Sequence, residues 1–425
     1  MPAPHESRDP QHQTQHQTQH QTQTQPVHSQ NLQNPQPPRF RLTPLSPRDP
    51  EEPGRVASSL ELFFDLVFVI AISISASELH HQLSAGHVLA GLSAFAHVFF
   101  GIWWAWMNYT WLGTSFSQDD WLYRLVTFVQ MSGVLVLAAG IKPVYEDGNY
   151  TLVVIGYIIM RIALVTQWLR AARGTRDPSL KRTAHRYALG VTIVQLLWWG
   201  ALALPGEVFA WAFFMLVGAE LLVPAIAERQ TRTPVHPHHI TERYSLFTLI
   251  LLGESLLGSA NAIIEALHEK HNLAPLIALG VLTLVVTAGL WWVYFWPPHH
   301  SRIGDLKSSL IYGYGHYFVF AAVGAFSAGI EAEVDLITGA SSLSQPWASF
   351  AYTAPIAVFL LGVWLLVVRT LGDAVVNTVM PLVAVLVLID PLIPVPFALT
   401  TVLIAALVAV LVWREPRIPQ PLPTS

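Results

Sequence analysis

Residues 61–72 of the chain are Glu61-Leu62-Phe63-Phe64-Asp65-Leu66-Val67-Phe68-Val69-Ile70-Ala71-Ile72, and they open its first long apolar segment. Glu61 and Asp65 are four residues apart, so a helix places both carboxylates on one face, one turn from each other. The two like charges repel, and near a bilayer each also carries a desolvation cost. The stretch therefore predicts a membrane helix whose acidic end faces protein or water instead of lipid.

The composition indicates a polytopic membrane protein. Of the 425 residues, 52% are hydrophobic and only 12% are charged, whereas soluble proteins carry about 25% charged residues. We therefore expect a lipid bilayer around the chain. The chain has no cysteine, which excludes disulfides, thiolate metal sites and cysteine nucleophiles.

Twelve apolar segments of about 20 residues follow residue 58, and a helix of that length spans the hydrocarbon of a bilayer. Very short connectors such as Leu204-Pro205-Gly206 indicate antiparallel hairpins of neighbouring helices. We predict an all-α polytopic membrane protein with about twelve transmembrane helices. The predicted spans are 60–81, 87–109, 121–141, 150–171, 185–204, 207–228, 243–264, 275–296, 308–330, 347–369, 373–392 and 396–414.

The placement of Lys and Arg supports this count and gives an orientation. If the N-terminus is cytoplasmic, 20 of the 23 basic residues fall on the cytoplasmic side, Lys142 and Lys270 fall outside, and Arg161 lies within a span. Cytoplasmic loops of membrane proteins carry such an excess. We predict a multi-pass protein of the cell (inner) membrane with both termini in the cytoplasm.

An ordered series of matches predicts that the chain is duplicated. Gly101-Ile102-Trp103-Trp104 matches Gly289-Leu290-Trp291-Trp292, and Gly140-Ile141 matches Gly329-Ile330, at offsets of 188 and 189 residues. An even number of helices per half gives two parallel repeats. We predict a first six-helix repeat over 58–232 and a second over 233–415.

The two ends of the chain lie outside these repeats. Residues 1–57 contain a Gln-His-Gln-Thr repeat followed by prolines and arginines, a composition that predicts a disordered cytoplasmic tail. A chain that starts near Glu51 is therefore expected to melt like the full chain. Residues 416–425 are a short C-terminal tail.

Ionisable residues within spans are candidates for a transport path. Arg161, Glu220 and Glu254 have similar predicted depths and could meet near the bilayer centre, where Glu254 is predicted to exchange a proton in a transport cycle. A second cluster could form near the cytoplasmic ends of the first and third spans. The candidates for an ion path are Glu61, Asp65, Arg124, Arg161, Glu220, Glu254 and His316.

Each candidate also has a structural interpretation. Glu61 and Asp65 could cap the first helix, because acids favour a helix N-terminus. Arg161 with one carboxylate could be an ion pair that only locks helices together, and His316 could be a hydrogen-bonded core histidine. The Trp103-Trp104 and Trp291-Trp292 pairs are interpreted as anchors at the membrane interface.

Known catalytic patterns are missing from the sequence. It has no Walker motif, no dinucleotide-binding glycine pattern, no His-Glu-x-x-His and no Gly-x-Ser-x-Gly. The loop histidines 236–239 and 299–300 could form a composite metal site, but no carboxylate pattern accompanies them. We expect no enzymatic activity, no cofactor, no bound metal and no nucleic-acid partner.

Two motifs resemble those of a known family. The stretch from Glu61 to Val69 is similar to the signature of the bacterial low temperature requirement protein A (LtrA) family, and Glu242-Arg243-x-x-Leu246-Phe247 with Leu252-Gly253-Glu254-Ser255 resembles its second block. The resemblance covers roughly residues 55–415 and implies a membrane protein of many helices, without naming a substrate.

The repeat and the charges within spans favour a secondary transporter of a small solute or ion that uses intramembrane carboxylates. An ion channel is the first alternative, because Phe64-Asp65 faintly resembles the Phe-Ser-Asp motif of a lysosomal-type potassium channel family. A membrane scaffold or lipid-handling protein is the second. The sequence does not indicate the substrate or the oligomeric state.

Overall fold

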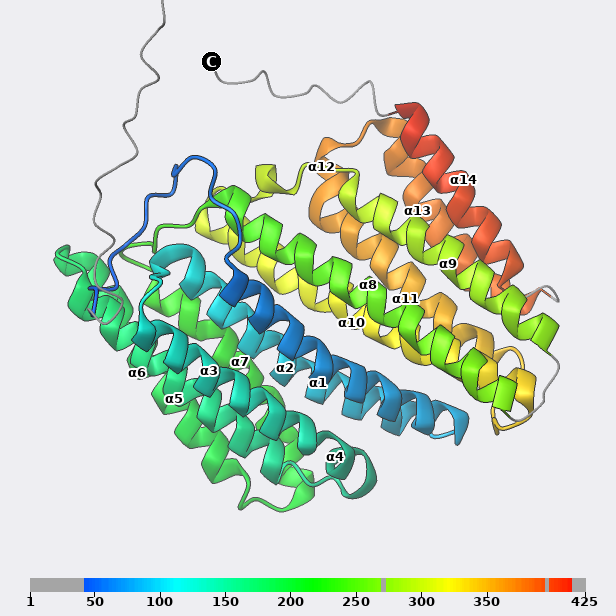
Figure 1. The fold of residues 1–425 in the computed structure, drawn as a ribbon, viewed down its shortest axis with the longest axis horizontal. Helices are drawn as coiled ribbons and strands as arrows, with labels where there is room; N and C mark the ends of the chain where they lie inside the picture. The colour runs from blue at the N-terminus through cyan, green and yellow to red at the C-terminus, as the bar shows by residue number, and fades with distance from the viewer. Residues whose placement is uncertain (1–41, 269–272, 394–396, 415–425) are drawn as a thin grey trace, which may run out of the picture. The chain divides into compact units, whose positions relative to one another are not determined.

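The structure is a computed structural model, and it describes residues 42–268, 273–393 and 397–414. All regular elements within these ranges are helical, and the long helices run side by side (Figure 1). The α-helices are α1 (Ser59–Ser84), α2 (Val88–Phe116), α3 (Trp121–Ala139), α4 (Ile141–Asp147), α5 (Thr151–Gly174), α6 (Pro178–Ala201), α7 (Gly206–Ala227), α8 (Pro237–His268), α9 (Leu273–Phe295), α10 (Leu306–Thr338), α11 (Trp347–Val363), α12 (Arg369–Leu371), α13 (Ala374–Ile389) and α14 (Ala398–Arg414). Two short 3₁₀-helices are η1 (His299–Arg302) and η3 (Asp390–Leu392), and η2 (Trp364–Val368) is a short π-helix that follows α11.

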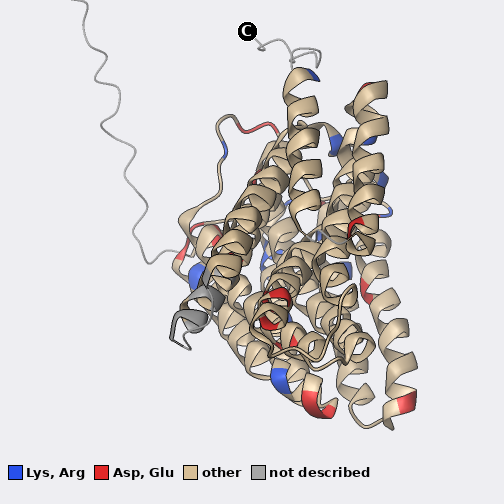
Figure 2. Ribbon diagram, turned by 90° about the vertical axis from the view of Figure 1, so that its right-hand side faces the viewer, with Lys and Arg blue, Asp and Glu red and all other residues tan. Residues whose placement is uncertain are grey.

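Within the described residues, nine helices are long and apolar enough to cross a membrane, and α14 is a shorter apolar helix. Figure 2 shows that charged residues are sparse along these helices. Many apolar side chains face outward, among them Leu89, Trp211 and Met215, which are 84%, 74% and 71% exposed. Such an outer surface suits lipid, so the structure is an all-helical, multi-pass membrane protein.

Several helices extend beyond the predicted spans. α2 continues to Phe116 instead of ending at residue 109, α10 continues to Thr338, and α8 begins at Pro237, six residues before its predicted start. These extensions carry polar side chains, so a prediction from hydrophobicity places them in loops. In the structure, polar side chains of the extensions form hydrogen bonds and ion pairs with other parts of the protein. The third predicted span is divided, because α3 ends at Ala139 and the short α4 follows Gly140.

α1 is the helix around which its neighbours pack, and it contacts α2, α3, α4, α8 and α10. It begins with a capping box in which the Ser58 hydroxyl accepts a hydrogen bond from the Glu61 N–H, while Glu61 accepts one from the Ser58 N–H. This reciprocal pair satisfies two amides that a helix N-terminus leaves free. The cap also fixes the position at which Glu61 and Asp65 enter the bundle.

Residues 42–57, here called the strap, lie across the ends of helices. Leu45 is 1% exposed, and an added Cβ on Gly174 would lie only 2.3 Å from the Leu45 carbonyl oxygen. Arg55 donates to the carbonyl oxygens of Gly113 and Thr114 at 2.9 and 2.6 Å. The prediction that residues 1–57 are disordered is therefore wrong for residues 42–57, because the strap packs on the helices and forms hydrogen bonds with them. Residues 1–41 lie outside the described residues.

Candidate functional site

Arg243 of α8 holds the two carboxylates of the first motif. Its side chain is wholly buried, and Nε and Nη2 lie 3.0 and 2.5 Å from the two oxygens of Asp65. Its Nη1 lies 3.2 Å from Glu61 Oε1. A guanidinium can form two parallel hydrogen bonds with one carboxylate. One cation from a different motif therefore offsets the repulsion between the negative charges of Glu61 and Asp65.

Aromatic side chains from α2 complete the surroundings of Asp65. The indole N–H of Trp106 donates to Asp65 Oδ1 at 2.6 Å, and the guanidinium of Arg243 lies 5.9 Å from the centre of the Tyr109 ring. Tyr109 also stacks on Phe64 at 3.7 Å between ring centres. Asp65 is thus a fully paired, buried anion, because a buried carboxylate is stable only with several donors.

Glu61 has two functions in the structure, one for each oxygen. Oε2 belongs to the capping box with Ser58, as the structural interpretation predicted. Oε1 points away from the cap and lies 3.4 Å from Nε2 of His239 as well as near Arg243. We call Glu61, Asp65, His239 and Arg243 the Arg243 cluster.

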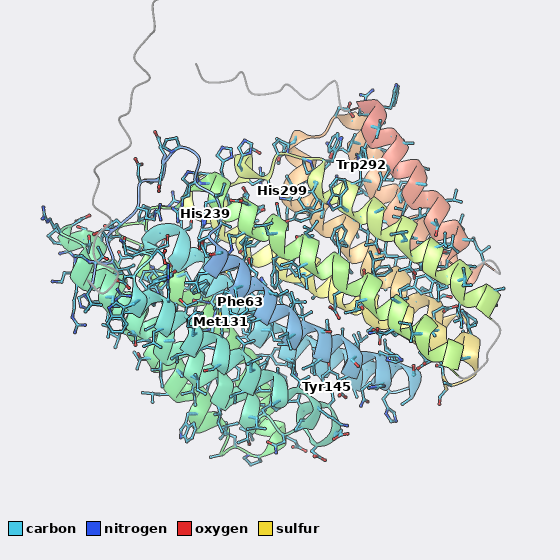
Figure 3. The ribbon with its side chains drawn as sticks, in the orientation of Figure 1. Phe63, Met131, Tyr145, His239, Trp292 and His299 are labelled. Carbon is cyan, nitrogen blue, oxygen red and sulfur yellow. The ribbon has the colours of Figure 1, made fainter. Side chains whose placement is uncertain are left out.

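A cavity of about 580 Å³ adjoins this cluster. We call it the Glu61 hollow; its wall includes Glu61, Tyr123, His239 and Arg55. Burial lowers the pKa of Arg55 to about 10, so this side chain remains a cation at neutral pH. In Figure 3, His239 lies at the end of the bundle at which α1 begins. The Glu61 hollow thus connects the buried cluster with the surface at that end.

The cluster predicted near the bilayer centre exists in part. Arg161 and Glu220 are each 2% exposed, and Arg161 Nη2 lies 3.4 Å from Glu220 Oε2. Arg161 also donates to the Tyr157 hydroxyl. Trp104 is buried and donates its indole N–H to Glu220 at 2.8 Å, so interpreting Trp103-Trp104 as an interface anchor was wrong. These contacts lock α5, α7 and α2 together.

Glu254 does not join Arg161. It accepts a hydrogen bond from the Ser73 hydroxyl of α1, because α8 packs on α1 and not on α5. Glu254 lines a separate polar cavity of about 300 Å³ between α1, α8 and α10, here called the Glu254 hollow. Its wall includes Ser77, His80, Glu331 and Asp335.

His80 connects α1 with α10 beside the Glu254 hollow. Its Nε2 lies 2.7 Å from Asp335 Oδ2 and its Nδ1 lies 3.2 Å from Glu331 Oε2. The Ser84 hydroxyl donates to the same Asp335 oxygen at 2.6 Å. None of these residues was predicted as part of the site, although His80 and Glu331 both occur at apolar helix ends, where an ionisable residue is a usable signal.

A dry section separates the two hollows. Between Asp65 and Ser73 the axis of α1 rises about 12 Å, and Phe68 and Ile72 in this section are fully buried. Phe247 of α8 packs against Phe320 of α10 with ring centres 5.1 Å apart, and Trp106 stacks on Phe247 at 4.3 Å. Polar hollows therefore occupy both ends of the α1–α8 pair, with aromatic packing between them.

Two further candidates lie apart from these groups. Arg124 contributes to the wall of the Glu61 hollow, but its side chain is 56% exposed and pairs with Asp119 at 2.6 Å, so it does not neutralise Glu61 or Asp65. The reason is that Arg243 already occupies that position. His316 is buried and bonded to the Tyr294 hydroxyl at 3.1 Å and the Tyr312 carbonyl at 2.7 Å, as expected of a core histidine.

The loop histidines pack against each other without forming a ligand set. The rings of His238 and His300 stack at 4.2 Å. In the part of the chain that the structure describes, no group of three or more histidine or carboxylate side chains could hold a metal ion.

Both motifs of the sequence meet at the Arg243 cluster, and a family model covers the helices that carry them. The model of the Bacterial low temperature requirement A protein (LtrA) matches residues 56–413. The chain belongs to the LtrA family. A curated protein similar to this LtrA protein is an uncharacterized protein of Rhizobium meliloti (strain 1021), 28% identical over 291 residues, which cover 63% of this chain and 68% of the relative. No solved structure matches this LtrA protein.

Proposed function

We propose that this LtrA protein is a secondary transporter of a small solute or ion, and that its substrate passes along α1, α8 and α10. The observation that carries the proposal is the pair of polar hollows at opposite ends of α1 and α8, separated by the packed rings of Trp106, Phe247 and Phe320. A carrier needs a path that is open at one end at a time. A channel needs a continuous hydrated path, which the aromatic section interrupts.

The charged groups link α1 to α8 at two places, so they are positioned to control a movement between these two helices. Asp65 and Arg243 link α1 to α8 near one hollow, while Ser73 and Glu254 link the same helices near the other. Rearrangement of either link would change how α1 packs on α8 without breaking a helix. We propose that Glu254 releases and binds a proton during this rearrangement, and that the protein acts as a carrier and not as an enzyme.

We further propose twelve transmembrane helices in two parallel repeats, α1–α7 and α8–α14. The order of packing supports this, because α1 packs on α2 and α3 as α8 packs on α9 and α10, and α3 packs on α5 as α10 packs on α11. A close approach recurs as well. An added Cβ on Gly140 would lie 2.7 Å from the Val153 nitrogen of α5, and one on Gly329 would lie 2.7 Å from the Tyr352 nitrogen of α11.

Flux measurements on the purified full chain in liposomes test the transport proposal. The liposomes contain a pH-sensitive dye, and gradients of Na⁺, K⁺, Cl⁻ and inorganic phosphate are imposed one at a time. We expect at least one gradient to produce a saturable flux accompanied by a change in internal pH. Glu254→Gln keeps the size and hydrogen bonding of the side chain but cannot lose a proton, so its flux should no longer follow the pH gradient.

The matched control is Glu207→Gln, because Glu207 is an exposed acid in the first turn of α7. It should retain the wild-type flux. Flux that is linear in substrate concentration would favour a channel instead. A well-folded Glu254→Gln protein with unchanged pH-dependent flux would remove Glu254 from the mechanism, and a folded wild-type protein that moves none of the four ions would contradict inorganic ion transport.

A further inference from the structure

Several buried polar atoms around Glu61 lack a hydrogen bond of normal geometry. Among the described residues, Glu61 Oε1, Arg243 Nη1 and the hydroxyls of Tyr109 and Tyr123 make no hydrogen bond of normal geometry. Tyr123 is 3% exposed and lines the Glu61 hollow. A Cβ added to Gly113 would lie 3.2 Å from Glu61 Oε1 and 3.7 Å from the Tyr123 hydroxyl, so these two atoms border the same small space. Buried polar atoms require a partner, and water that enters from the hollow can supply it.

Among the charged side chains at this space, His239 is the one whose charge can change near neutral pH. Asp65 is held by Arg243 through two bonds, and Arg55 lies in the same wall of the hollow as Glu61. The two carboxylates are thus balanced by two guanidinium groups, neither of which loses its proton in proteins. His239 is the remaining group, and the imidazole is the side chain suited to change charge near neutral pH.

The contacts of His239 permit both of its charge states. Its Nε2 lies 3.4 Å from Glu61 Oε1, and a hydrogen on Nε2 can point to that oxygen. Its Nδ1 lies 3.1 Å from the Thr114 hydroxyl. A hydroxyl donates to a bare Nδ1 and accepts from a protonated one, so rotation of this one hydroxyl satisfies the neutral ring and the imidazolium equally.

We propose that the Glu61–His239 pair is a proton-binding site filled from the Glu61 hollow, and that this proton is the coupling ion of transport. In the binding step an O–H bond of hydronium in the hollow breaks, water remains, and the proton adds to the neutral His239 ring, which then carries N–H bonds at both Nε2 and Nδ1. The second half of the proposal rests on the transport function proposed above. The first half stands on the geometry of the pair alone.

Binding of the proton acts on the contact between α1 and α8. Oε1 of Glu61 is shared between Arg243 and His239, and the neutral ring competes weakly for it. The imidazolium attracts the same oxygen more strongly than the neutral ring does, which weakens the hold of Arg243 on Glu61 while Asp65 keeps its two bonds. Tyr109, Tyr123 and His236 face the pair from α2, α3 and the residue that precedes α8, and the charged side chains of Arg48, Glu52, Asp119 and Arg124 line the same hollow.

NMR of the full chain in nanodiscs, with its histidine rings labelled with ¹³C, tests the proton site. The His239 signal is identified by its loss in His239→Gln, with His81→Gln as the control for an exposed histidine at the other end of α1. We expect His239 to titrate, and its midpoint to move to lower pH by about one unit in Glu61→Gln, because that variant removes the adjacent negative charge. Gln at this position still completes the capping box, so folding is preserved. Glu254→Gln should leave the midpoint unchanged.

Proton flux into the dye-loaded liposomes tests the coupling. We expect His239→Gln to reduce the pH-driven flux at least tenfold and His81→Gln to retain it. A His239 signal that does not titrate, or a midpoint that is the same in Glu61→Gln as in the wild-type protein, would overturn the proton site. An unchanged flux in His239→Gln would overturn the coupling. If the wild-type protein gives no flux while the His239 midpoint still moves in Glu61→Gln, the proton site stands and the transport function fails.

Discussion

At the scale of single residues, Arg243 is the side chain on which the site depends. It is buried between two carboxylates of another helix, and its removal leaves the fully buried Asp65 without its cation. We expect Arg243→Met to destabilise the protein by about 3–5 kcal/mol, as when one partner of a buried ion pair is lost. Thermal denaturation in detergent measures this, and Arg243→Met with Asp65→Asn should recover part of the loss.

Arg124 provides the matched control for this prediction, because it is also an arginine in an ion pair but is exposed to solvent. Arg124→Met should melt like the wild-type protein. Equal destabilisation by the two substitutions, or no recovery in the double variant, would contradict the assignment of Arg243 as the partner of Asp65.

His299, in the turn η1, gives a pH dependence whose sign follows from burial. Its Nε2–H donates to the Tyr294 carbonyl oxygen and its Nδ1 accepts from the Tyr312 hydroxyl, and burial lowers the pKa of His299 to about 4. The unfolded chain, with a histidine pKa of about 6.5, binds more protons between these two values. Stability is therefore complete above about pH 6.5 and is lost as the pH falls towards 4, by about 3 kcal/mol in total.

The measurement is the melting temperature of the full chain at a series of pH values. We expect His299→Gln to flatten the decline between pH 6.5 and 4, and the less buried His300 to matter less when it is replaced by Gln. A decline of equal steepness in His299→Gln would show that another group causes the acid sensitivity.

The sequence predicted some of these residues and missed others for a physical reason. Arg161 was expected to pair with Glu220 or Glu254, and the structure pairs it with Glu220. Depth along a helix, which hydrophobicity gives, does not say which way a helix faces, so Glu254 was placed with Arg161 although it faces α1. Arg243 was quoted in the second motif and counted among the cytoplasmic basic residues, but it was not proposed as a site residue, because its helix begins six residues before the apolar pattern does.

At the scale of elements, the helices were predictable and their extensions were not. Hydrophobicity marks the part of a helix that lies in lipid, and all nine helices able to cross a membrane, among the described residues, overlap predicted spans. The outer turns of α2, α8 and α10 are held by hydrogen bonds and ion pairs between residues far apart in sequence, such as His80 with Asp335. No local pattern indicates such partners.

The strap is the element whose contribution differs most from the sequence prediction. Leu45→Ala should destabilise the protein by about 2–3 kcal/mol, because it empties a buried position, whereas Leu42→Ala, at a position 54% exposed, should have no effect. A chain that starts at Leu42 should melt like the full chain, and one that starts at Ser58 should melt earlier. Identical melting of the two truncated chains would show that the strap contributes no stability.

At the scale of the whole molecule, the orientation in the membrane is still a prediction, and the composition makes it easy to test. The chain has no cysteine, so single cysteines can be introduced without removing any. In intact cells, a maleimide that cannot cross the membrane should label Asp147→Cys, at the exposed last residue of α4, and should not label Ser46→Cys, at an exposed position of the strap. The reverse pattern would place the strap, and with it the start of α1, outside.

Because of the contacts of the strap, that one experiment also assigns the side of the membrane on which other connectors lie. Its backbone and side chains bond to Ser115 at the end of α2, to Asp120 before α3, and to His236 and Glu242 at the start of α8. Segments joined by direct hydrogen bonds cannot lie on opposite sides of a bilayer. A label on a single residue of the strap therefore assigns the sidedness of two distant parts of the chain, the α2–α3 connector and the start of α8, and with them the compartment from which the Glu61 hollow is filled.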